Sequence, residues 1–213
     1  MSLPHKPELK VDWCSYKAAK YAVKHWHYSK RMPTSTLNII GVWENDSFIG
    51  VVIFGHGVGR YLLKPYGLEF NRGCELVRVA LRKHKSPVSQ IVSYSIKLLK
   101  KKNPKLRLVV SFADPDAGHY GGIYQAGNWI YNGKSPRRYM FRHKITGELY
   151  YDRSVSENLG IRGVSVRPSE CTKEYKPGKF RYLYPLDRNM RKKIEKLRKP
   201  YPKQKDVRMT KRK

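Results

Sequence analysis

Five side chains able to bind or transfer protons are crowded into one short segment of this chain. They are Asp114, Asp116, His119, Tyr120 and Tyr124. The run before them, residues 106–112 (LRLVVSF), is short, apolar and β-rich, which predicts a strand buried on both faces. Polar groups just beyond such a strand lie where open α/β sheets place ligands, so we expect a site here. Asp116 is better explained as an N-cap of a short helix over residues 118–127, whereas Asp114 fits a turn and a general base equally well.

A second candidate site lies upstream, where a predicted strand at 74–82 (CELVRVALR) leads into a predicted helix at 88–99. Ser86 is the expected N-cap and Pro87 the first helical residue. The helix N-terminus would offer free N–H groups beside the cations Arg82, Lys83 and Lys85, a combination suited to a pyrophosphate. An ordinary capped helix near a basic surface is the alternative, because the chain has neither a Walker A motif nor a dinucleotide glycine fingerprint.

Charge is the second strong signal in the sequence. The chain has 45 Lys and Arg against 16 Asp and Glu, a formal net charge of +29. Such an excess predicts a polyanionic partner, and double-stranded DNA is favoured because tyrosines and tryptophans are interleaved with the basic residues. No long apolar span or signal peptide suggests a membrane. The three cysteines have no CxxC spacing, which favours a reducing compartment over a disulfide framework.

The order of predicted elements indicates the fold class. A helix at about 13–27 is followed by a β-hairpin (37–43 and 48–54), the strand–helix–strand unit described above, a short helix, and further strands at 129–132 and 139–151. This order predicts an α/β fold: a mixed central sheet with flanking helices and two central strands joined by a crossover helix.

Three regions are expected along the chain. Residues 1–155 form the predicted catalytic domain, and residues 156–190 form a basic, aromatic extension packing on it. Residues 191–213 are dominated by Lys and Arg and interrupted by prolines, so we expect a flexible DNA-binding tail that contacts phosphates.

Several longer motifs resemble the Mom family of bacteriophage DNA-modification proteins, which has an acetyltransferase-like (GNAT-like) fold. The motifs are HYSKRMP at 27–33, ELVRVAL at 75–81, SFADPDAGHYGGIYQAGNWIYNGKS at 111–135 and KFRYLYPLDR at 179–188. The resemblance covers roughly residues 10 to 190, so the tail lies outside it.

The resemblance implies an enzyme of a phage that works in the host cell cytoplasm. It would convert adenine in duplex DNA to N6-(carbamoylmethyl)adenine, also called the acetamido form, and so protect phage DNA from restriction. Acetyl-CoA is the implied cofactor. An enzyme acting on a base in a duplex must flip it out. The aromatic side chains available to stack on that base are Tyr28, Tyr120, Tyr124 and Trp129, each of which has core packing as its alternative.

The resemblance also implies which residues form the site. The positions matching the family's catalytic motifs are His27, Tyr28, Glu75, Arg78 and Asp114. A buried ion pair between Glu75 and Arg78 is the structural alternative for those two. The residues expected to line the acetyl-CoA cradle are Arg82, Lys83, Ser86, Val88, Ser89 and Tyr124.

The implied product raises the question of a metal. Attack of an amine on a thioester joins nitrogen to the carbonyl carbon, whereas the carbamoylmethyl product joins N6 to the former methyl carbon. A redox metal such as Fe(II) is therefore a hypothesis, with His27 and Asp114 as the preferred ligands from a pool that also contains His25, Glu75 and His119.

Two other functions remain open from the sequence. A conventional N-acetyltransferase acting on a small amine or a protein lysine would use the same cradle without a metal, but the charge of +29 argues against it. A non-enzymatic DNA-binding protein would leave the Asp/His/Tyr cluster without a role. The sequence leaves the oligomeric state undetermined.

Overall fold

The computed structural model describes residues 7–56, 61–159 and 165–204, and the chain divides into two compact units. The first unit comprises Met1–Ala113, Gly121–Gly133 and Arg181–Pro202, and the second comprises Asp114–Tyr120, Lys134–Phe180 and Lys203–Lys213. Residues 155 and 190, where the sequence suggested boundaries, lie within the second and the first unit, respectively. The proposed tail also begins inside the first unit, and its last residues, 205–213, lie outside the described part of the chain.

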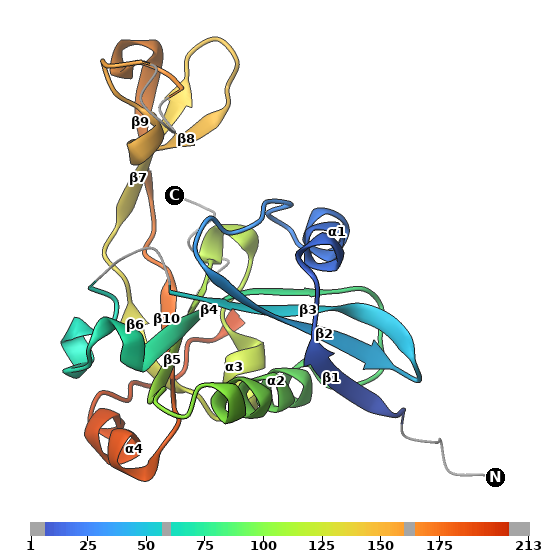
Figure 1. Ribbon diagram of the computed structural model, residues 1–213. Helices are drawn as coiled ribbons and strands as arrows, with labels where there is room; N and C mark the ends of the chain where they lie inside the picture. Colours follow the sequence, from blue (N-terminus) through green and yellow to red (C-terminus); the bar gives the residue numbers. More distant parts are fainter. Residues whose placement is uncertain (1–6, 57–60, 160–164, 205–213) are drawn as a thin grey trace. The chain divides into compact units, whose positions relative to one another are not determined.

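A seven-stranded sheet organises the first unit (Figure 1). In spatial order its strands are β1 (Leu9–Trp13), β2 (Leu37–Glu44), β3 (Ser47–Gly55), β4 (Gly73–Leu81), β5 (Leu108–Ala113), β10 (Phe180–Pro185) and β6 (Ile130–Lys134). The first four strands pair antiparallel, whereas β4 and β5 pair parallel. The β2–β3 turn has positive φ at Asn45 and Asp46, the backbone that suits a two-residue hairpin.

The helices cover the sheet with short apolar stripes. Figure 1 shows α1 (Tyr16–Trp26) on one face of the sheet and α2 (Val88–Lys102) on the other. Ser15 caps α1, whose Ala19, Ala22 and Val23 pack on residues of β2, β3 and β4. Helix α2 is the crossover that makes β4 and β5 parallel. The mixed α/β fold with flanking helices is therefore confirmed.

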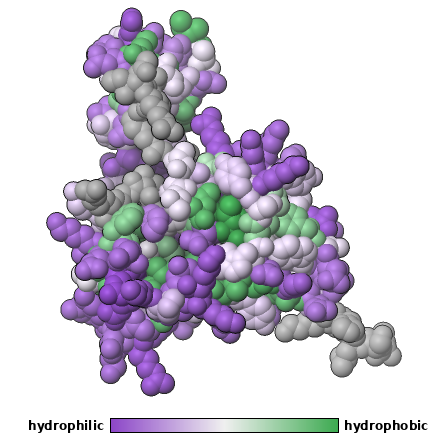
Figure 2. Space-filling model, viewed as in Figure 1, coloured by the Kyte–Doolittle hydropathy of each residue, from purple (hydrophilic) through white to green (hydrophobic). Residues whose placement is uncertain are grey.

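The C-terminal region contributes to the core of the first unit. Strand β10 lies between β5 and β6, and α4 (Arg188–Glu195) follows it. Met190 and Ile194 of α4 join a buried cluster with Leu108, Val110 and Leu183. The outer face of α4 is basic, and Figure 2 shows hydrophilic side chains over this helix. The expected flexible tail is thus, at its start, an amphipathic helix.

The second unit contains a three-stranded antiparallel sheet with the order β8-β7-β9. Its strands are β7 (Arg138–His143), β8 (Leu149–Tyr151) and β9 (Cys171–Lys176). Gly147, with φ +70°, lies in the turn of the β7–β8 hairpin. Among the described residues, short 3-10 helices occur at Lys64–Tyr66, Phe70–Arg72, Pro115–Ala117, Asp152–Ser154 and Pro168–Glu170.

Local details differ from the sequence prediction at three places. Helix α2 has Pro87, not Ser86, as its N-cap, because the Ser86 side chain bonds elsewhere. The helix expected at 118–127 is the shorter α3 (Gly122–Ala126). It is preceded by the 3-10 turn Pro115–Ala117, which is capped by Asp114 rather than by Asp116. The opening arm also contains β1, a strand that the sequence did not reveal.

Candidate active site

The central feature of the first unit is the point where β4 and β5 stop pairing. Their parallel ladder runs from Gly73 with Leu108 to Leu76 with Ser111, while β4 continues to Leu81. Ser111 is buried there, and its hydroxyl donates to the carbonyl of Leu76 at 2.8 Å. Because that uses its only proton, the Ser111 oxygen accepts from the Tyr124 hydroxyl, also 2.8 Å away. Tyr124 is therefore anchored where the two strands part.

Tyr124 is positioned by α3 and enclosed by aromatic rings. Its ring centroid lies 5.0 Å from that of Trp129 and 5.0 Å from that of Tyr182. Burial raises the pKa of the Tyr124 hydroxyl to about 12, opposed by the Ser111 hydrogen bond and reinforced by Tyr28 and Glu75. The hydroxyl keeps its proton at neutral pH. Tyr28 and Glu75, two other residues proposed from the sequence, are thus close enough to Tyr124 to influence its pKa.

His27 and Tyr28 follow the last turn of α1. His27 is the C-cap residue and is buried, and its Nδ1 accepts a hydrogen bond from the Ser29 backbone N–H at 3.1 Å. A neutral His27 therefore carries its proton on Nε2 and presents a donor there. Tyr28 is 57% exposed, and its ring lies 4.4 Å from the His27 ring. An exposed ring held by a neighbouring ring is suited to stacking on a planar ligand.

Arg78 on β4 holds the segment that follows His27. Its Nε and Nη2 both lie 3.3 Å from the carbonyl oxygen of Arg31, and Nη1 donates to the carbonyl of Val77 at 2.7 Å. These contacts connect the 27–33 motif to the 75–81 motif. The structure thus gives Arg78 a positioning contact between two segments that the sequence singled out separately.

The predicted coenzyme cradle holds a carboxylate of the chain itself. Glu44, the last residue of β2, accepts hydrogen bonds from the backbone N–H groups of Lys85 and Ser86 and from the Ser86 hydroxyl, at 2.7 to 3.1 Å. Burial alone would raise the pKa of the Glu44 carboxyl, but the hydrogen bonds from Ser86 and Lys85 outweigh it and lower the pKa. The cradle therefore binds anionic oxygen, as predicted for a pyrophosphate, with Glu44 as the group bound.

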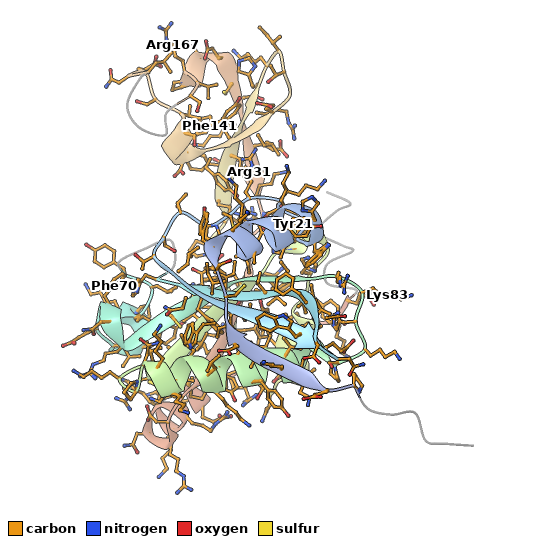
Figure 3. The ribbon with its side chains drawn as sticks, turned by 45° about the vertical axis from the view of Figure 1, so that its right-hand side comes forward. Tyr21, Arg31, Phe70, Lys83, Phe141 and Arg167 are labelled. Atoms are coloured by element: carbon orange, nitrogen blue, oxygen red, sulfur yellow. The ribbon has the colours of Figure 1, made fainter. Side chains whose placement is uncertain are left out.

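The remaining cradle residues surround this anion-binding loop. Arg82 and Lys83 are exposed, and Figure 3 shows Lys83 directed away from the ribbon. Val88 and Ser89, in the first turn of α2, are half-buried.

Asp114 belongs to the second unit, where it is an ion-pair centre. Its Oδ2 lies 3.1 Å from Arg138 Nη2 and 3.0 Å from Lys179 Nζ, and its Oδ1 accepts from the Asp116 backbone N–H at 3.1 Å. The residue is only 8% exposed. Both carboxylate oxygens are thus engaged by cations or an N–H group, which is the environment of a structural carboxylate.

These contacts bear on the proposed iron ligands. A carboxylate held by two cations is a poor donor to Fe(II), and Asp114 is held in this way by Arg138 and Lys179. Across the described residues, no group of three or more His, Cys, Asp and Glu is placed to hold a metal ion. The donor set does not fit the metal as predicted, so no step through iron is derived.

The predicted site residues lie in both units. Tyr28 and Glu75 each influence Tyr124 in the first unit, Arg78 binds the carbonyl of Arg31 after His27, and Asp114 pairs with Arg138 and Lys179 in the second unit. Three residues in these contacts have no role predicted from the sequence: Ser111, Glu44 and Lys179. The sequence could have indicated Ser111, because its hydroxyl lies inside a strand that is otherwise apolar. It could not have indicated Glu44, because the partners of Glu44 are about forty residues away in sequence.

Comparison with known proteins places the chain in a family. The Mom protein family matches residues 8–203, and the chain belongs to that family. The curated relative is the methylcarbamoylase Mom of Escherichia phage Mu, which is 30% identical over 206 residues, covering 92% of this chain and 84% of the relative. The resemblance inferred from the motifs is confirmed.

Two solved structures can be aligned with most of this chain. FeeM, an N-acyl amino acid synthase from uncultured soil microbes, has a TM-score of 0.48 and 8% identity, covering 89% of this chain and 97% of its own. An acetyltransferase structure from Acinetobacter baylyi ADP1 has a TM-score of 0.47 and 10% identity, covering 87% of this chain and 96% of its own.

Proposed function

We propose that this chain is a phage DNA-modification enzyme that converts adenine in duplex DNA to N6-(carbamoylmethyl)adenine and protects phage DNA from restriction inside the host cytoplasm. The observation that carries the proposal is membership of the Mom family, together with 30% identity to a methylcarbamoylase over nearly the whole chain. The charge of +29 supports a DNA substrate, because neutralising phosphates releases counterions. The described residues contain no helix long and apolar enough to span a membrane.

Acetyl-CoA is the proposed cofactor and would supply the two-carbon unit. The backbone N–H groups of Lys85 and Ser86 and the Ser86 hydroxyl would hold its pyrophosphate, because they already bind a carboxylate in this structure. Arg82 and Lys83 would add positive charge, and Val88 and Ser89 would line the same loop. Glu44 must leave these donors when the coenzyme binds.

The base-binding end of the site lies at the 27–28 motif and the parting of β4 and β5. The exposed Tyr28 ring would stack on the flipped adenine, and the Nε2–H of His27 would donate to an acceptor on the base. Glu75 is the better candidate for the general base at N6, since its charge acts on Tyr124 and Asp114 is bound to two cations. Tyr124 keeps its proton and, through its hydrogen bond to Ser111, would hold this end of the site in place.

Mass spectrometry of nucleosides tests this proposal. Plasmid DNA from cells expressing the wild type should contain a deoxyadenosine adduct of the mass of an acetamido group. Glu75→Gln should remove the adduct while DNA binding and the unfolding midpoint stay unchanged. The matched control is Glu69→Gln, an exposed glutamate of the same unit, which should retain the adduct.

Two results would contradict the proposal. Unmodified DNA together with tight acetyl-CoA binding would indicate a conventional N-acetyltransferase. DNA binding with neither modification nor coenzyme binding would indicate a non-enzymatic DNA-binding protein.

A further inference from the structure

One face of the three-stranded sheet in the second unit carries aromatic rings and a single cation. Antiparallel register sets Tyr139 opposite Tyr175 and Phe141 opposite Lys173 in the β7–β9 pair, and Phe141 opposite Tyr150 in the β7–β8 pair. Directly opposed residues point to the same side, and alternate residues of a strand share a face. These five residues therefore form one surface, which we call the aromatic face; Phe141 is labelled in Figure 3.

The rings of the aromatic face lie at the surface and contact one another. Tyr175 is 69% exposed and Tyr139 is 38% exposed. Tyr139 meets Tyr175 edge-on at 6.3 Å and Phe141 edge-on at 5.6 Å between centroids. Lys173 Nζ lies 3.8 Å from the Tyr139 centroid and 5.9 Å from that of Tyr175. The rings are thus held in place by their neighbours while Tyr175 remains accessible to a ligand.

The opposite face of the same sheet uses its charges internally. Glu174 pairs with Arg142 at 2.7 Å and with Lys176, and Arg138 pairs with Asp114. Hydrogen bonds from Lys176 and Arg142 lower the pKa of the Glu174 carboxyl, although burial opposes them. On the aromatic face the strand residues include one cation and no carboxylate. The nearby Glu148, in the turn before β8, accepts from the Tyr150 hydroxyl at 2.5 Å.

We propose that the aromatic face binds unpaired DNA bases, with Tyr175 and Tyr139 stacking on the bases and Lys173 contacting the phosphates. Exposed rings beside a cation are the arrangement by which proteins bind single strands without reading sequence. A closed duplex hides its base faces within the stack, so it offers the exposed rings no surface on which to stack. This inference rests on the proposed function, because extruding an adenine leaves nucleotides without partners that the enzyme must hold.

Fluorescence anisotropy with a labelled thymidine single strand and a duplex hairpin of equal charge tests the inference. Tyr175→Leu should weaken single-strand binding by about tenfold, the order of one lost stack, and leave duplex binding within twofold. Tyr175→Phe should bind like the wild type, because it keeps the ring. Tyr151→Leu is the matched control: Tyr151 is 44% exposed in the same sheet and, opposite Met140, faces the other side.

Three results would overturn the inference. They are equal losses of single-strand and duplex binding, no loss of either, or the same loss of single-strand binding in Tyr175→Leu and Tyr175→Phe. Lys173→Gln is a second variant for the same surface, and it should reduce the salt dependence of single-strand binding. The unfolding midpoint of each variant excludes a general loss of structure.

Failure of the proposed function is measured independently by the nucleoside adduct. Selective loss of single-strand binding without any adduct from the wild type would leave the aromatic face established and refute the modification chemistry. An adduct from the wild type, combined with unchanged single-strand binding by Tyr175→Leu, would refute the aromatic face alone.

Discussion

Glu44 and the coenzyme are expected to compete for the same hydrogen-bond donors, and Glu44→Ala tests this directly. The carboxylate accepts from Lys85 N–H, Ser86 N–H and the Ser86 hydroxyl, and so ties the end of β2 to the loop before α2. A pyrophosphate bound at this loop needs the same N–H groups. Removing the carboxylate should therefore weaken the fold and strengthen coenzyme binding.

The expected size of the stability loss follows from the contacts. Hydrogen bonds to a charged group contribute about 1.5–3 kcal/mol each when shielded from water. Glu44 is half-buried, so screening and competing water reduce the total, and we expect a loss of about 1–2 kcal/mol in the free energy of unfolding. Releasing the donors in the free protein should tighten CoA binding by roughly the same free energy, about fivefold to thirtyfold.

The direction in which the stability loss of Glu44→Ala changes with pH can also be predicted. The pKa of Glu44 is lowered in the folded state, so its contribution is complete above the pKa of the unfolded chain and is lost as pH falls through the lower, folded value. The stability difference between wild type and Glu44→Ala should be constant near neutral pH and shrink in acid.

Urea unfolding monitored by fluorescence and isothermal titration with CoA measure the two effects. Glu8→Ala is the matched control, because Glu8 is an exposed glutamate just before β1 whose backbone atoms, not its side chain, bond to Asn45 after β2. Weaker CoA binding by Glu44→Ala at unchanged stability would refute the reasoning, since it would mean that Glu44 helps to hold the coenzyme.

Two further predictions concern residues whose backbone or charge is constrained. Gly121→Ala should lower the free energy of unfolding by about 2–4 kcal/mol in urea unfolding, because Gly121 has φ +91° and an added Cβ would overlap the Tyr182 ring. Gly118→Ala, at φ +81° with open space around it, should cost only about 1 kcal/mol, and equal losses would refute the packing argument. Asp114→Ala should cost about 2–4 kcal/mol in thermal unfolding, because Lys179 loses its carboxylate partner and Arg138 keeps only Asp116, 3.6 Å away; full stability with loss of the adenine adduct would instead make Asp114 a catalytic group.

The parts of the fold that the sequence predicted correctly depend on short-range patterns. Runs of apolar, β-branched residues marked β2, β3, β4 and β5, and the apolar spacing of residues 88–99 marked α2. The parts that it did not predict depend on distant partners. Strand β10 enters the sheet between β5 and β6, and β1 becomes a strand only by pairing with β2. Neither segment carries a local signal for those neighbours.

The segment of residues 111–131 shows the same limit for the site. Its polar residues are close in sequence, yet Asp114–Tyr120 belong to the second unit and Gly121–Gly133 to the first. Tyr124 lies in the first unit, where Ser111 holds it beside the end of the β4–β5 ladder. Asp114 lies in the second unit, where it pairs both with Arg138 at the start of β7 and with Lys179 just before β10.

This division changes how variants of the segment must be interpreted. A substitution at Asp114 removes the partner of two cations, so loss of DNA modification alone would not identify a general base. Glu75→Gln tests the charge itself, because it preserves the size of the side chain on β4 and removes the charge that acts on Tyr124; its unfolding midpoint shows whether the fold depends on that charge. A pH–rate profile that loses its acidic limb in Glu75→Gln and keeps it in a folded Asp114→Asn variant would place the base on β4, next to the anchored tyrosine.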